Sequence, residues 1–270
     1  MTNKIACGID LAGFSTGKSG LAKAELVETN RIEVTVFVDH LFAKSRRGFA
    51  KVEDVVDAEA DLLVRLLEEG KVLIDMPLDL QDLGNHEQAE MLWQLTKRPV
   101  DYVFSALPPL ADKIGSPVAR AQAFLKRLQK GNPNLVRFGE NIFETYPAGS
   151  LELVGLDRSG YKGQTTTFNE GKWRGETLAK IANGLNLKAA HEEVSMNDDD
   201  IDAIICSIAG VVDSANILEC NELQKEIEKR LQDSLPASAT KVDCTPPQGY
   251  RLLKEIGYCE IHVSKRAWGQ

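Results

Sequence analysis

The sequence predicts an α/β protein in which three antiparallel strands, followed by parallel strands, form one mixed sheet flanked by helices. Two observations support this fold class. The first 42 residues contain three strand-like segments separated by short turns. From residue 50 onward, helical patterns alternate with short apolar strands, which is typical of parallel pairing. Hydrophobic residues make up 43% of the chain and charged residues 27%, values that are ordinary for a globular protein.

The first half of the chain supplies the antiparallel strands, a helix and a parallel strand. Strands are expected at about 4–12, 20–27 and 32–42, and the third segment, IEVTVFVDHLF, is rich in β-branched and aromatic residues. A helix is expected at about 50–69, where apolar residues recur at helical spacing before Gly70. The segment KVLIDMP then indicates a short buried strand that ends at Pro77.

The second half alternates helices with further strands. Helices are expected at about 86–96, 117–130, 172–185, from 198 onward and at 219–234, with strands at about 136–146 and in the C-terminal segment. The sequence contains no internal repeat and no low-complexity linker. We therefore predict a single domain over 1–270 with partly helical insertions at about 77–135 and 148–197.

The N-terminal glycine-rich segment partly matches a phosphate-binding loop. Gly17, Lys18 and Ser19 fit the end of the pattern G-x-x-x-x-G-K-[ST], but position 12 is Ala12 instead of glycine. The pattern also requires a helix directly after the loop, whereas 21–26 alternates as a strand. We therefore interpret the segment as a hairpin connection and expect that Lys18 does not anchor a triphosphate.

Composition excludes several classes of protein. The five cysteines contain no C-x-x-C pair and the four histidines are dispersed, so no zinc pattern is present. A net charge of −8 disfavours a protein that coats nucleic acid, although it permits a local basic groove. No apolar run approaches the roughly 18 residues of a membrane span, and the N-terminal segment lacks the apolar core of a signal peptide. We expect a cytoplasmic protein with no membrane partner.

Acidic residues stand at the ends of several predicted elements. Asp10, Asp75 and Glu144 each lie at the end of a predicted strand, and Asp199 and Asp202 open the late helix. Carboxylates near a core are costly unless they are paired or bind a metal. Because the ends of neighbouring strands meet in one crevice of an α/β sheet, we expect these side chains to form a site.

The late helix can present acids at the edge of an apolar face. Its isoleucines form one stripe at about 100° per residue, and Asp199 and Asp202 lie together on another stripe. Asn197 is expected to cap this helix, with Asp198 and Asp200 favoured by the positive end of the helix dipole. The spacing therefore directs Asp199 and Asp202 toward the strand ends.

The element order is that of a ribonuclease H-like fold, and five motifs resemble one family. GIDLAG…GLA, LIDMPL, ETYPA, DDDIDAIICSIAG and PPQGY occur in the order found in uncharacterised proteins described as predicted nucleases with this fold. Holliday-junction resolvases of the RuvC type are more distant relatives. The resemblance implies that Asp10, Asp75, Glu144 and Asp202 are the acidic site residues, with Asp199 as a partner. Asp75 departs from the resolvase pattern, where the corresponding residue is more often glutamate.

The expected activity is metal-dependent hydrolysis of phosphodiesters, as in a nuclease or phosphodiesterase. Oxygen ligands without histidine or cysteine suit Mg²⁺ or Mn²⁺. Two such ions about 4 Å apart would activate a water and stabilise the leaving oxygen. In this scheme Asp10, Glu144 and Asp202 are catalytic: Asp10 bridges both ions, and Glu144 and Asp202 hold one each. Asp75 and Asp199 complete the set of metal ligands.

A phosphoester substrate requires basic residues near the acids, and two other functions are also compatible with the fold. A nucleic acid or another phosphoester needs positive partners, and the candidates are Lys18, Arg98, Lys162, Lys172 and Arg174. An actin-like nucleotide phosphotransferase also begins with a GID strand and a glycine-rich hairpin. That fold repeats its unit, however, and the sequence contains no second GID segment followed by a glycine-rich hairpin. A non-catalytic binding protein on the same fold is the other alternative.

Overall fold

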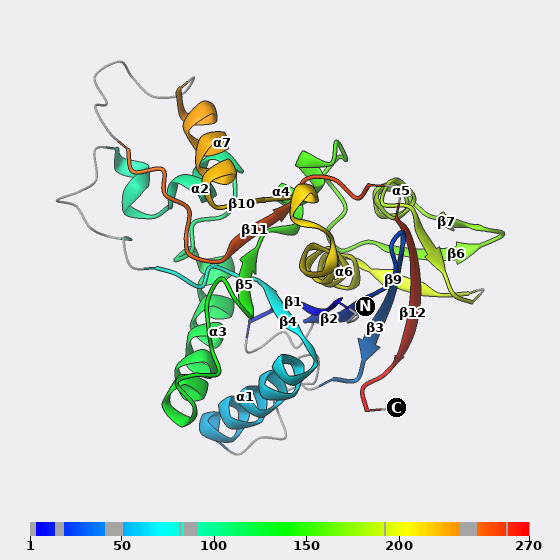
Figure 1. Ribbon diagram of the computed structural model, residues 1–270, viewed down its shortest axis with the longest axis horizontal. Coiled ribbons are helices and arrows are strands. Elements are labelled where there is room, and N and C mark those ends of the chain that lie inside the picture. The colour runs from blue at the N-terminus through cyan, green and yellow to red at the C-terminus, as the bar shows by residue number, and fades with distance from the viewer. Residues whose placement is uncertain are drawn as a thin grey trace.

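The computed structural model describes residues 4–13, 19–40, 51–80, 83, 91–191, 193–232, 242–257 and 259–269. Its main feature is a nine-stranded mixed sheet with helices on both faces (Figure 1). The strands follow the order β10-β11-β5-β4-β1-β2-β3-β12-β8. They are β1 (Lys4–Asp10), β2 (Gly20–Glu28), β3 (Arg31–Val38), β4 (Lys71–Asp75), β5 (Ile142–Thr145), β8 (Leu187–Ala189), β10 (Ile217–Glu219), β11 (Tyr250–Leu253) and β12 (Glu260–Ala267).

Strand directions confirm the predicted fold class. The three N-terminal strands are antiparallel to one another, and β4 and β5 continue the sheet parallel to β1. This central arrangement, β5-β4-β1-β2-β3, is the one expected for a ribonuclease H-like sheet. On one side β11 adds parallel to β5 and β10 adds antiparallel to β11; on the other side β12 and β8 add parallel to β3.

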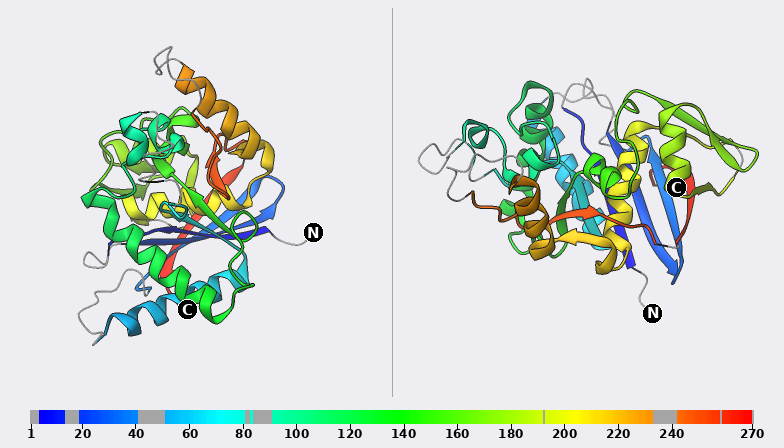
Figure 2. Two further views of the ribbon diagram at one scale, coloured as in Figure 1. Left: turned by 90° about the vertical axis from the view of Figure 1, so that its left-hand side faces the viewer. Right: turned by 90° about the horizontal axis from the view of Figure 1, so that it is seen from above.

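Two helical layers cover the sheet (Figure 2). The helices are α1 (Val52–Glu69), α2 (Pro99–Val103), α3 (Asp112–Gly131), α4 (Pro147–Leu153), α5 (Thr177–Gly184), α6 (Asp198–Val211) and α7 (Cys220–Gln232), with 3₁₀ turns η3 (Leu92–Leu95) and η4 (Ser214–Asn216). One face of the sheet packs on α6, and the other packs on α1 and α3. Residues alternate between these faces along β1: Ala6 belongs to the α6 core, and Cys7 and Ile9 belong to the opposite core.

Glycines allow α6 to approach the sheet at unusually short range. A Cβ atom on Gly8 of β1 would lie 2.1 Å from the carbonyl oxygen of Ala203, and one on Gly20 of β2 would lie 2.1 Å from that of Asp199. Such distances exclude any side chain at either position unless the backbone moves. The glycines of the first hairpin therefore serve the packing of α6 against the strand that carries Asp10.

Gly8→Ala is expected to lower the free energy of unfolding by about 3 kcal/mol, because the added methyl group forces α6 away from β1. Urea unfolding of the two proteins measures the difference. Gly131→Ala is the matched control, since a Cβ there meets no atom within 4 Å and alanine favours a helix. An equal effect of both substitutions would contradict the close packing described here.

The insertion at 148–197 differs from its predicted structure. It contains a separate three-stranded sheet, ordered β7-β6-β9, made of β6 (Thr165–Asn169), β7 (Lys172–Arg174) and β9 (Ser195–Asn197). The expected helix at 172–185 is wrong in its first part, where β7 lies, and α5 begins at Thr177. Glu170 and Gly171 both have positive φ, which is the geometry of a two-residue hairpin turn between β6 and β7.

Other boundaries shift by a few residues. The strand expected at 136–146 is confined to β5, and the C-terminal segment adds two strands instead of one. The helix expected at 117–130 begins earlier, with Pro117 in its second turn. Residues 86–90 of the helix expected at 86–96 lie outside the described residues, and 92–95 forms the 3₁₀ turn η3. Among the described helices, none is long and apolar enough to span a membrane.

Candidate functional site

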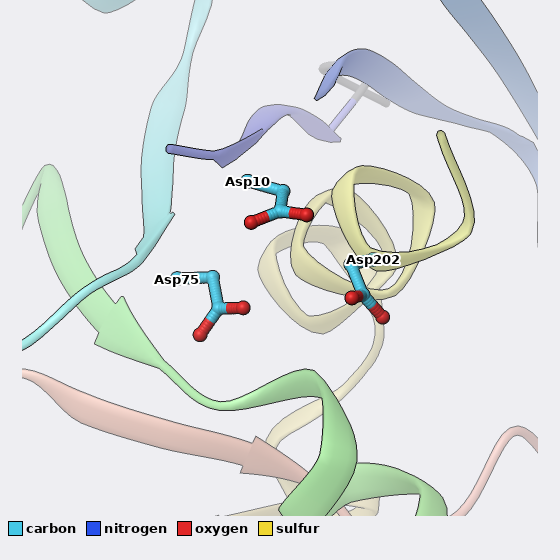
Figure 3. A group of neighbouring side chains, drawn as sticks. All are labelled: Asp10, Asp75 and Asp202. Carbon is cyan, nitrogen blue, oxygen red and sulfur yellow. The ribbon is translucent and has the colours of Figure 1, made fainter. Parts of the chain in front are cut away.

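Three of the predicted acids converge at one edge of the sheet. Asp10 and Asp75 end β1 and β4 and are direct partners in the parallel register. Asp202 lies in the second turn of α6, which packs across these strands. One oxygen from each of the three carboxylates lies within 4.8 Å of the others. Figure 3 shows the three side chains gathered between the ends of β1 and β4 and the helix.

Strand alternation explains this convergence. Asp10 lies two residues after Gly8 and therefore faces α6, as Ala6 does. Asp75 is two residues after Leu73, which also belongs to the α6 core. Because Gly8 leaves room for the helix backbone, Asp202 is brought down to the level of both strand ends.

The three carboxylates have raised pKa values. Burial raises the pKa of Asp10 well above its ordinary value; Lys162 opposes the rise, and Asp202 and Asp75 add to it. Burial and the charge of Asp202 raise the pKa of Asp75 from 3.8 to about 8. Burial also raises the pKa of Asp202, against the opposing effect of Lys162. Like charges are thus held together in a poorly solvated place, which a cation would relieve.

Lys162 supplies a positive charge directly at this cluster. It lies in the loop between α4 and β6, where its ammonium group donates a hydrogen bond to Asp202 Oδ2 and lies 3.9 Å from Asp10 Oδ2. The neighbouring Tyr161 is buried, and its hydroxyl donates to Asp202 Oδ1 at 2.9 Å. Of the predicted phosphate-binding residues that the structure describes, Lys162 is the one that contacts this cluster.

The cluster opens into a cavity of about 520 Å³. Thr145, at the end of β5, lines this cavity together with the three aspartates. Its side chain is 2% exposed, and its hydroxyl oxygen has no hydrogen-bond partner. Thr145 shares the α6 side of β5 with Phe143, as Asp75 shares that side of β4 with Leu73. A buried hydroxyl without a partner beside three carboxylates indicates a place where a ligand completes the hydrogen bonding.

Glu144 lies apart from the three aspartates. Glu144 is two residues after Ile142, so both side chains lie on the side of β5 opposite to Phe143 and Thr145. Its carboxylate accepts two hydrogen bonds from Arg98, at 2.6 and 2.9 Å, and one from the backbone N–H of Leu78 at 2.9 Å. Arg98 and the Leu78 backbone therefore hold the Glu144 carboxylate in place, and Glu144 lies outside the cluster of three aspartates.

Arg98 is saturated by partners within the protein. Besides Glu144, it donates to both carboxylate oxygens of Asp101 and to the backbone carbonyl of Asp79. These bonds occupy all five N–H donors of a guanidinium group. Although Arg98 lines the cavity, it has no donor left for a phosphate, which differs from its predicted role.

The acids at the start of α6 have separate roles. Asn197 caps the helix as predicted, and Asp200 completes a capping box and pairs with Lys265 at 2.7 Å. Asp198 accepts a hydrogen bond from the backbone N–H of Gly163. Asp199 lines the cavity, and its pKa is raised to about 6 by burial and by Asp198, but it lies outside the three-carboxylate cluster.

Two of the remaining predicted phosphate ligands do not line the cavity. Lys172 and Arg174 are exposed on β7 in the small sheet, and Arg174 pairs with Glu170 at 2.8 Å. Lys18 lies outside the described residues. Tyr161 and Thr145 were missed from the sequence, although each directly neighbours a predicted site residue, Lys162 and Glu144 respectively.

The raised pKa of Asp75 predicts a pH-dependent stability in metal-free solution. Between about pH 4 and pH 8 the folded state keeps a proton that the unfolded state releases, so the free energy of unfolding falls as pH rises. Asp75→Asn is expected to match the wild type near pH 4 and to exceed it by about 1–3 kcal/mol near pH 8. Urea unfolding with EDTA at both pH values measures this, and identical pH slopes would contradict it.

Comparison with known proteins places the chain in a family. The family model described as "Protein of unknown function (DUF429)" matches residues 8–215, which contain Asp10, Asp75, Glu144 and Asp202. Searches of the curated proteins and of the solved structures returned no match. The matched region extends from β1 through α6, and so includes every element that carries a carboxylate of the site. The chain therefore belongs to this family of proteins of unknown function.

Proposed function

We propose that this protein is a metal-dependent hydrolase of phosphoester bonds, acting as a nuclease or phosphodiesterase. The observation that carries the proposal is the meeting of Asp10, Asp75 and Asp202 at a cavity of about 520 Å³, with their oxygens within 4.8 Å of one another. These residues come from three distant parts of the chain. Burying three carboxylates together lowers the stability of the fold, and a bound cation would offset this loss.

The chemistry of the donors suits Mg²⁺ or Mn²⁺. The three carboxylates offer hard oxygen ligands, and no histidine or cysteine lies among them. Burial and mutual repulsion raise the pKa values of Asp10 and Asp75, so the cluster is stabilised by a positive partner. A divalent cation competes with protons for that place because it can bind all three carboxylates at once. When bound, such an ion polarises a phosphoryl oxygen and lowers the pKa of a coordinated water.

The surrounding residues complete the proposed site. Asp10, Asp75 and Asp202 hold the metal, and Lys162 offers a positive charge for a phosphate oxygen at the cavity mouth. Tyr161 orients Asp202 through its hydroxyl group. Glu144 and Arg98 support the wall of the cavity as a buried ion pair. The proposed substrate is a nucleic acid or a smaller phosphoester, and a cytoplasmic location stays a prediction.

One activity assay distinguishes the proposed hydrolase from two alternative functions. An actin-like phosphotransferase would transfer or hydrolyse the terminal phosphate of ATP, and a binding protein would take up metal or ligand without turnover. Purified protein is incubated with single-stranded DNA, duplex DNA, RNA, bis(p-nitrophenyl) phosphate and ATP, each with Mg²⁺, Mn²⁺ or EDTA. We expect a phosphodiester to be cleaved with Mn²⁺ or Mg²⁺ and not with EDTA. Cleavage that survives EDTA, or turnover of ATP alone, would refute the proposal.

A further inference from the structure

The acid cluster already contains one cation of the protein itself. Three carboxylates meet there, and the Lys162 ammonium group contacts Asp202 and lies 3.9 Å from Asp10. One divalent ion together with one ammonium group balances three carboxylates. A second divalent ion would leave an excess of positive charge around buried side chains, which is unfavourable where solvent screening is weak.

A second ion would also lack ligands. Glu144 was the residue expected to hold it, but Arg98 and the backbone N–H of Leu78 occupy its carboxylate. Among the described residues, the cluster of Asp10, Asp75 and Asp202 is the one group of three acidic, histidine or cysteine side chains with ligand atoms this close. The three clustered carboxylates are therefore a set of donors that suits a single ion.

The unpartnered hydroxyl of Thr145 supports a ligand place beside the cluster, independently of the acids. Thr145 lines the same cavity and is almost fully buried. Its position at the end of β5, on the same side of the sheet as Asp75 and Asp10, gives a single ion or its water a neutral oxygen contact. The Thr145 hydroxyl therefore favours a ligand on the side of the cluster next to β4 and β5. Lys162 contacts the cluster on its other side, at Asp202.

The structure holds Lys162 in place through its neighbours. Tyr161 is buried and bonded to Asp202, and the backbone N–H of Gly163 donates to Asp198. The loop is thus tied to α6 on both sides of Lys162. The Lys162 side chain itself is 58% exposed, so it remains open to solvent while its ammonium group contacts Asp202.

We propose that Lys162 is the second cation of this site, so that the site holds one divalent ion beside the Lys162 ammonium group instead of two divalent ions. The inference rests on the proposed metal-dependent function and specifies its composition. The Lys162 ammonium group takes the place of a second metal ion toward the phosphate of the substrate, to which it offers a charge-assisted hydrogen bond.

Titration with Mn²⁺ tests this without any turnover. The wild-type protein and Lys162→Met are titrated in a calorimeter, and free Mn²⁺ is counted by electron paramagnetic resonance. We expect one Mn²⁺ per wild-type chain. We expect Lys162→Met to bind Mn²⁺ about tenfold more tightly, because it removes a positive charge from the cluster. Lys172→Met is the control, since Lys172 is exposed on β7, and it should bind as the wild type does.

Each outcome separates this inference from the proposed function. Two Mn²⁺ ions of similar affinity in the wild type, or an affinity that Lys162→Met leaves unchanged or lowers, would overturn the inference even if the protein hydrolyses phosphodiesters. One ion per chain and tighter binding by Lys162→Met, without hydrolysis of any substrate, would support the inference and refute the hydrolase. Thermal unfolding of Lys162→Met confirms that the variant is folded, as expected for an exposed side chain.

Discussion

Replacing Arg98 with methionine is expected to lower the free energy of unfolding by about 3–5 kcal/mol. The substitution leaves the buried carboxylates of Asp101 and Glu144 without their cation, and it also removes the bond to the carbonyl of Asp79. Loss of one partner from a buried ion pair is costly because the remaining charge is neither paired nor solvated. Urea unfolding near pH 7 measures the loss.

Arg137→Met is the matched control for this change. Arg137 pairs with Glu140 at 2.7 Å, but both side chains are more than half exposed, so water replaces the lost contact. The expected change is within about 0.5 kcal/mol. If Arg98→Met were no more destabilising than Arg137→Met, the buried ion pairs of Arg98 would not hold this wall of the cavity together.

Asp10→Asn is expected to lower metal-dependent hydrolysis by about 1,000-fold or more, a loss typical of a catalytic group. The same change should weaken Mn²⁺ binding, because asparagine is a neutral and poorer ligand. The metal-free variant should be as stable as the wild type or more stable, since repulsion by Asp75 and Asp202 is relieved. Initial rates, Mn²⁺ titration and urea unfolding measure the three quantities.

The control is Asp213→Asn, which removes a carboxylate just beyond the far end of α6. Asp213 is exposed and pairs with Lys4, so its replacement should leave rate, metal affinity and stability nearly unchanged. A large loss of stability in Asp10→Asn would indicate that Asp10 is a structural residue. Full activity in that variant would remove Asp10 from the proposed mechanism.

The parts of the site that were predictable from sequence depend on local patterns. Strand alternation places Asp10 and Asp75 on one face, and the helical period sets Asp202 apart from the isoleucines of α6. The role of Gly8 and Gly20 was not predicted from the sequence, because only the packing shows that they allow α6 to approach the sheet. The order of strands and helices was enough to predict the central strands β5-β4-β1-β2-β3, but not the edge strands β8 and β10.

Long-range pairing accounts for what the sequence did not reveal. Glu144 was expected at the end of its strand, as Asp75 is, but β5 ends one residue later at Thr145. This shift of one residue turns Glu144 toward Arg98 and presents Thr145 to the site instead. Whether Lys162 or Lys172 reaches the acids depends on how the insertion folds, and β7 carries Lys172 away from the cavity. Neither choice is encoded in residues adjacent in sequence.

The most direct test of the central claim is a crystal structure of the protein soaked with Mn²⁺, with data collected at the manganese absorption edge. We predict one anomalous peak within coordination distance of the carboxylates of Asp10, Asp75 and Asp202, and no comparable peak at Glu144. A fully soaked crystal with no peak among these three aspartates, or with its manganese bound elsewhere in the protein, would refute the proposed metal site.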